Sequence, residues 1–357
     1  MLRFLSINDI ARPIAIFIVL VLIRLPFLLS HHHYMDIELQ NLLIGESISS
    51  GILQYRNVAD YISPLSAISF NIIIFLFGKS FLALRVLSIL LIFAQAMIFN
   101  YGVLRLRILN TQGFMPAAVY IIIASCNIEF MTLSPVLLST TFILIAIFKT
   151  ISIILDKNQK ETIYTVGIHL SIAVLFYVPV LVYTLPFMLI LVAYSHLRIK
   201  AYIIFLYGIF FPLLCVAVFF FWNQSLLAIS TDVFLHAYSF AKKSELTAIG
   251  IATSFSSIVL IAVLGIKKAL FTQVYINFQR RSFASFLATL FGFFLLLILS
   301  PILDYSLFFL LVPVAAILVS AIFDFEYVKL KKEIAFLLSA ITITAGYIYS
   351  LYLIYTN

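Results

Sequence analysis

Residues 201–222 read AYIIFLYGIFFPLLCVAVFFFW, a run that contains no charged side chain. An α-helix needs about 20 apolar residues to cross about 30 Å of hydrocarbon, and this run has the length and composition of such a helix. A transmembrane β-strand would instead alternate apolar and polar residues over about ten positions. The run therefore predicts a helical membrane span.

Similar apolar runs recur along the whole chain. They lie at about 12–30, 63–78, 81–103, 114–127, 135–154, 163–178, 180–195, 201–222, 248–265, 283–299, 306–323 and 334–354. Of the 357 residues, 64% are hydrophobic and 10% are charged, whereas a soluble domain carries about 25% charged residues. We therefore expect one all-α polytopic membrane domain over residues 1–357, with about 11–12 transmembrane helices and no soluble domain.

The distribution of basic residues predicts which connectors lie in the cytoplasm. The net charge of +8 comes largely from short connectors between apolar runs, a pattern that sets membrane orientation and argues against a nucleic-acid partner. The basic connectors carry Arg105/Arg107, Lys149/Lys157/Lys160, Arg198/Lys200, Lys267/Lys268 with Arg280/Arg281, and Lys329/Lys331/Lys332. They alternate with connectors of little positive charge, with the exception of 223–247, which carries Lys242 and Lys243. We place the basic connectors and the N-terminus, with Arg3 and Arg12, in the cytoplasm.

Segment 63–78 decides the number of crossings. With the N-terminus inside, residues 31–62 lie outside, and reaching Arg105 inside requires an odd number of crossings, although two apolar segments intervene. Segment 63–78 is the shorter of the two and contains Pro64 and Asn71. We favour a re-entrant or interfacial position for it, which leaves about eleven full spans. The alternative is twelve spans with one violation of the charge rule.

Two external loops, 31–62 and 223–247, are long enough to hold a functional site. In the first, Asp36 and Glu38 follow the first span and lead into 37–50, a predicted amphipathic helix with Leu39, Leu42 and Leu43 on one side. A carboxylate at a helix start is also favoured by capping and by the helix dipole. Since residues two apart on a helix point in different directions, Asp36 and Glu38 converge on one ligand only if Asp36 precedes the helix.

Several further residues could bind the substrate or its phosphate at the outer membrane surface. For the phosphate itself, Arg offers a bidentate fork and Lys a mobile charge. The candidates are Arg24, Arg56, Asp60, Arg85, Lys242, Lys243 and His236. Each has a simpler alternative: Arg24 can extend to the interface and Arg85 can anchor its helix there. The two lysines can contact lipid headgroups, and Asp60 and His236 can be solvated.

The order of these residues resembles the start of the GT-C superfamily, the multi-span glycosyltransferases that use polyprenyl-phosphate-linked sugars. The matching elements are Asp36 and Glu38, the helix ending near Gly51, Tyr55, Pro64 and Leu65, Gly78, and Arg85. The resemblance is limited to about residues 36–85. A difference is that Glu38 stands where the family often has a second acid directly adjacent to the first.

The resemblance implies a site at the outer face of the membrane. Asp36 would deprotonate the acceptor hydroxyl, and cationic side chains would hold the lipid phosphate. Glu38 would support Asp36 or help to hold a divalent cation, the one cofactor that the resemblance suggests. Membrane lipids and a polyprenyl-phosphate sugar donor would be the partners.

Three functions remain open from the sequence. The first is a GT-C-like glycosyltransferase in the bacterial cytoplasmic (inner) membrane. The second is a non-catalytic GT-C-like subunit or scaffold that binds a partner protein or lipid; the chain ends at Asn357 without the large soluble domain of many family members, which favours this reading. The third is a transporter or flippase for a lipid-linked anion, which predicts paired charges within spans.

Overall fold

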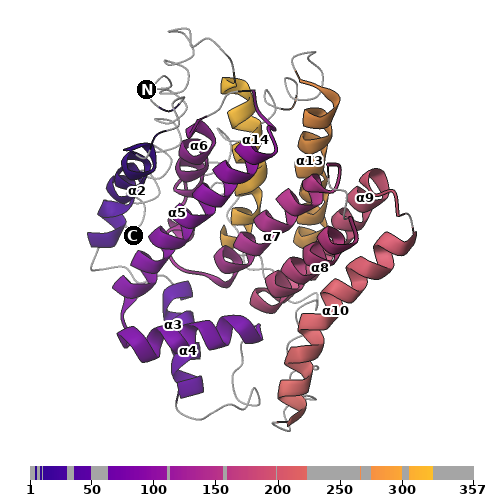
Figure 1. The fold of residues 1–357 in the computed structure, drawn as a ribbon. Coiled ribbons are helices and arrows are strands. Elements are labelled where there is room, and N and C mark those ends of the chain that lie inside the picture. The colour runs from indigo at the N-terminus through magenta and orange to yellow at the C-terminus, as the bar shows by residue number, and fades with distance from the viewer. Residues whose placement is uncertain are drawn as a thin grey trace.

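The computed structural model describes most of the predicted helical segments. The described residues are Leu5, Asp9, 11–29, 36–49, 63–110, 113–155, 159–197, 199–222, Ile266, 275–299 and 305–324. Within them the chain forms α-helices and short 3-10 helices and no β-strand (Figure 1). The predicted all-α class is confirmed. The predicted segments 248–265 and 334–354 lie outside the described residues.

Most helix bounds agree with the apolar runs to within four residues, whereas α13 begins six residues before its run. The helices are α2 (Ala11–Leu29), α3 (Asp36–Ser49), α4 (Pro64–Phe77), α5 (Phe81–Arg105), α6 (Met115–Ala124), η1 (Ile128–Phe130), α7 (Pro135–Ser152), α8 (Gln159–Phe176), η2 (Val178–Tyr183), α9 (Thr184–Tyr194), α10 (Ile199–Trp222), α13 (Asn277–Leu299), η6 (Tyr305–Leu311) and α14 (Val312–Phe323). In the described residues, six helical stretches are long and apolar enough to cross a membrane: α2, α5, α7, α10, α13 and Ser306–Phe323. The chain is a multi-pass membrane protein.

Local sequence explains where several helices begin. Pro64 and Pro135 open α4 and α7, where the missing N–H and the fixed φ of proline suit the first helical turn. The hydroxyls of Ser80 and Ser134 accept hydrogen bonds from backbone N–H groups in the first turns of α5 and α7. These caps satisfy donors that a helix start leaves without an internal partner.

One end of the bundle gathers the connectors that the charge pattern placed in the cytoplasm. The Gln279 side chain, at the start of α13, donates to the Arg107 carbonyl oxygen at 3.1 Å. The backbone N–H of Asn110 donates to the Asp324 carboxylate at 2.8 Å. Tyr275 also donates to Asp324, at 2.9 Å. Burial and the nearby carboxylate raise the pKa of Tyr275, so its hydroxyl stays protonated and remains a donor.

Helix α4 begins and ends at the opposite end of the bundle. Near its start, the Ser66 hydroxyl donates to the carbonyl oxygen of Phe176, the last residue of α8, at 2.6 Å. Just after its end, Lys79 forms an ion pair with Glu46 of α3. Figure 1 shows α3 and α4 together at this end. Because both ends of α4 lie on one side, α4 does not cross the bundle, which agrees with the re-entrant or interfacial position favoured for segment 63–78.

This arrangement predicts a specific labelling pattern. In a variant that lacks the native cysteines, Glu46→Cys and Lys79→Cys are both expected to react with a membrane-impermeant maleimide added outside intact cells. Leu155 is 63% exposed and lies just after the C-terminal end of α7, in a connector that the charge pattern places in the cytoplasm. Leu155→Cys is therefore expected to react only after permeabilisation. Labelling of positions 46 and 79 from opposite sides would contradict the fold of α4, and labelling of both only after permeabilisation would reverse the predicted orientation.

Candidate functional site

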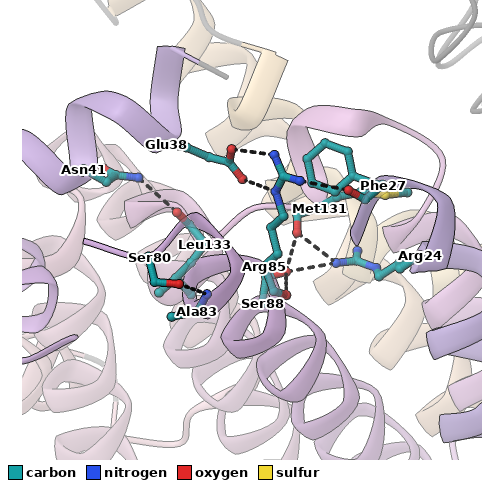
Figure 2. Close-up of polar contacts among 10 residues, drawn as sticks. All are labelled: Arg24, Phe27, Glu38, Asn41, Ser80, Ala83, Arg85, Ser88, Met131 and Leu133. Carbon is teal, nitrogen blue, oxygen red and sulfur yellow. Dashed lines mark hydrogen bonds and ion pairs between the residues drawn. The ribbon is translucent and has the colours of Figure 1, made fainter. Parts of the chain in front are cut away.

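A buried ion pair joins helix α3 to the first turns of α5. Both oxygens of the Glu38 carboxylate accept from the Arg85 guanidinium, with Nε–Oε1 at 2.9 Å and Nη2–Oε2 at 3.0 Å. The exposed fractions of the two side chains are 0% for Glu38 and 5% for Arg85. A bidentate pair of this kind has charge-assisted bonds and one fixed relative orientation. The pair therefore sets the position of Glu38 against α5 (Figure 2).

Arg85 also contacts the end of the first span. Its Nη1 donates to the Phe27 carbonyl oxygen at 2.9 Å, and its guanidinium carbon lies 4.3 Å from the centre of the Phe27 ring. Phe27 lies in the last turn of α2, where carbonyl groups lack helical partners and a cation is favoured. Arg85 consequently holds α2, α3 and α5 together at one point.

Arg24, one turn before Phe27, is 1% exposed and is bonded within the protein. Its guanidinium donates to the carbonyl oxygens of Ala124 at 2.8 Å, Phe130 at 3.1 Å and Met131 at 3.5 Å, and to the hydroxyls of Ser125 at 3.2 Å and Ser88 at 3.3 Å. The Ala124 carbonyl ends α6, and the other two carbonyls belong to the irregular backbone around η1, between α6 and α7. Non-helical backbone at membrane depth requires such partners. Arg24 therefore stabilises this connector rather than extending to the interface.

Two polar side chains that the sequence analysis did not single out complete the site. The Asn41 amide of α3 donates to the Leu133 carbonyl oxygen at 3.0 Å. The Ser88 hydroxyl, one turn after Arg85, contacts the Met131 carbonyl oxygen, which also accepts from Arg24 (Figure 2). Ser88 thus connects the contacts of Arg24 to the helix that carries Arg85. The sequence could have indicated both residues, because each is polar and lies one helical turn after a predicted site residue: Asn41 after Glu38, and Ser88 after Arg85.

Helix α3 turns its polar face toward the protein. Glu38 and Asn41 are buried, whereas Leu39 and Leu43 are 47% and 55% exposed. In a membrane protein the exposed apolar side chains contact lipid, so this inverted arrangement suits a helix at the bilayer surface. Of the three leucines on the predicted apolar side, only Leu42 is buried.

Of the other predicted site residues, the structure describes only the backbone of Asp36. Helix α3 begins at Asp36, so Asp36 and Glu38 belong to one helix, and the side chain of Asp36 lies outside the described residues. The remaining candidates also lie outside them: Arg56, Asp60, His236, Lys242 and Lys243. The described residues thus bring together Glu38, Arg24 and Arg85.

The chemistry of this cluster does not fit a divalent cation at Glu38. Both carboxylate oxygens are directed at Arg85, whose positive charge disfavours a cation at the same oxygens. Among the described residues, no group of three or more His, Cys, Asp or Glu side chains is arranged to hold a metal ion. The predicted role of Glu38 as a metal ligand gains no support from this geometry.

Comparisons with protein-family models, curated proteins and solved structures found no match to this chain. Its membrane character rests on the six apolar spans and on the large apolar side chains at its surface. Phe75 of α4 and Trp222 of α10, for example, are each 86% exposed. Such side chains are favourable against lipid and costly in water. Contact with membrane lipids therefore follows from the structure, and a specific function has to be argued from the site.

Proposed function

We propose that this chain is a GT-C-like integral membrane glycosyltransferase that uses a polyprenyl-phosphate-linked sugar at the outer face of a bacterial cytoplasmic membrane. The observation that best supports the proposal is the anchoring of α3, the helix that follows the first span, through the buried pair of Glu38 and Arg85. Asp36 lies two residues before Glu38, at the start of this helix. A general base has to be held within hydrogen-bonding reach of its substrate.

In the proposed reaction, the Asp36 carboxylate accepts the proton of the acceptor hydroxyl. The hydroxyl oxygen forms a bond to the anomeric carbon of the sugar, and the bond from that carbon to the phosphate oxygen breaks. Polyprenyl phosphate leaves with the bonding electrons. Since Arg24 and Arg85 already donate to protein groups, we assign contact with the leaving phosphate to Arg56, Lys242 and Lys243.

Replacement of the proposed base tests this function. We expect Asp36→Asn to reduce product formation about 100-fold or more, because general-base catalysis contributes at least that factor. The measurement is mass spectrometry of glycans and lipid-linked sugars from cells in which the variant replaces the native protein. Glu46→Gln, which removes a partly exposed carboxylate of the same helix, is the control and is expected to leave the products unchanged.

A normal product profile in cells with Asp36→Asn, at wild-type protein abundance, would exclude the enzymatic proposal. It would favour the second candidate, a non-catalytic subunit that binds a protein or lipid. The mutual bonding of Glu38 and Arg85 suits this candidate as well, because a scaffold also needs rigid helix contacts. Recovery of a stoichiometric partner protein after mild detergent extraction would support it directly.

A further inference from the structure

We infer that Glu38 and Arg85 form a positioning pair that fixes the N-terminal turn of α3, and that neither residue contacts the substrate. The consequence for catalysis rests on the proposed function, since the turn that is fixed carries Asp36. The structural part of the inference is independent of any reaction. It follows from how α3 is attached to the bundle.

Three buried contacts of α3 lie on successive turns. Glu38 binds Arg85, Asn41 donates to the Leu133 carbonyl oxygen, and Gly45 packs directly on α4. A Cβ atom at Gly45 would lie 2.7 Å from the Phe70 carbonyl oxygen, so the two helix backbones touch and α3 cannot slide there. The Asn41 and Gly45 contacts hold the middle of the helix. Among these three contacts, only the Glu38 pair holds the turn that includes Asp36.

The geometry of Arg85 supports positioning over phosphate binding. Its Nε and Nη2 bind one carboxylate and its Nη1 binds the Phe27 carbonyl oxygen. The carboxylate neutralises the guanidinium charge in a buried environment. A phosphate that approached Arg85 would meet the negative charge of Glu38 at contact distance, which is unfavourable at low dielectric.

A second ion pair on the same helix provides a matched control. Glu46, near the other end of α3, pairs with Lys79, and the side chains are 42% and 60% exposed. Exposed pairs contribute little to stability or order because water screens them. Removal of the Glu46 pair is therefore expected to leave α3 in place, whereas removal of the Glu38 pair is expected to release its first turn.

Electron paramagnetic resonance distance measurements test the difference. Spin labels are attached at Leu39→Cys on α3 and Tyr101→Cys on α5, positions that are 47% and 61% exposed, in a background with Cys126→Ala and Cys215→Ser. We expect a narrow distance distribution in the parent and in Glu46→Gln. In Glu38→Ala its width should about double, as expected when a helix end opens locally. If Glu38→Ala does not fold, Glu38→Gln is measured instead. An unchanged narrow distribution in the folded variant overturns the inference.

Binding of polyprenyl monophosphate to the protein in lipid nanodiscs provides the second readout. A positioning role predicts that the Kd of Glu38→Ala, in which Arg85 is retained, and that of Arg85→Met stay close to wild type. A loss of about tenfold or more in Arg85→Met alone would identify Arg85 as a phosphate ligand and overturn the inference. A broadened distance distribution together with full activity of Asp36→Asn would instead remove the proposed function and leave the positioning role intact.

Discussion

Arg85→Met is expected to destabilise the protein by about 3–5 kcal/mol, because it leaves the buried Glu38 carboxylate without its principal ionic partner. The Met side chain fills most of the volume of Arg85, so the loss reflects the charge rather than a cavity. The measurement is equilibrium unfolding in mixed micelles with increasing sodium dodecyl sulfate. Lys79→Met, which breaks the exposed pair with Glu46, is the control and should cost about 0–1 kcal/mol.

The double variant Glu38→Leu with Arg85→Met separates charge from packing. We expect it to recover most of the lost stability, since apolar residues of similar volume often replace a buried ion pair at no net cost. A double variant as unstable as Arg85→Met alone would indicate that the bond from Arg85 to the Phe27 carbonyl oxygen, rather than the pair, carries the stability.

Arg24→Leu is the second substitution with a large expected effect, a loss of about 3 kcal/mol or more. It removes hydrogen bonds to the carbonyl group of Ala124 at the end of α6 and to two carbonyl groups in the connector between α6 and α7. Each buried carbonyl left without a donor costs about 1–3 kcal/mol. The stability of Arg24→Lys should lie between that of the wild-type protein and that of Arg24→Leu, because an ammonium group donates from one point and cannot span the same acceptors. The same unfolding measurement applies.

The reactivity of a cysteine in this connector distinguishes local opening of the connector from a general loss of stability. Cys126 lies within it and is 3% exposed. In a Cys215→Ser background, Arg24→Leu should increase the rate at which Cys126 reacts with N-ethylmaleimide well below the unfolding midpoint. Wild-type stability together with an unreactive Cys126 would show that the connector does not depend on Arg24.

The helices could be predicted because the bilayer imposes a length and a composition on each of them. The predicted run at 201–222 became α10, and the run at 81–103 became α5, with ends displaced by two residues or fewer. That α4 does not cross the bundle was also predicted, from charge alternation and from the short length of its apolar run. These features depend on residues close together in sequence, which a single chain displays directly.

The partners within the site could not be predicted. Glu38 and Arg85 are 47 positions apart, and Arg24 and Ser125 are 101 positions apart. Hydrophobic periodicity places each residue on a helix but does not state which helix ends meet. Arg24 and Arg85 were candidates for phosphate binding, with a place at the membrane interface as the alternative, and the structure shows both bonded to protein groups. The proposed role of Asp36 stays a prediction.

The contacts of Arg24 have a consequence for biosynthesis. Its carbonyl partners lie 100 to 107 positions later in the chain, so the ribosome delivers the first span to the membrane before those partners exist. An arginine at the centre of an inserting helix costs about 2.5–3.5 kcal/mol on translocon scales, and Arg24, five residues before the end of α2, faces a smaller cost of the same kind. The nascent first span therefore enters the membrane without the hydrogen bonds that later satisfy Arg24.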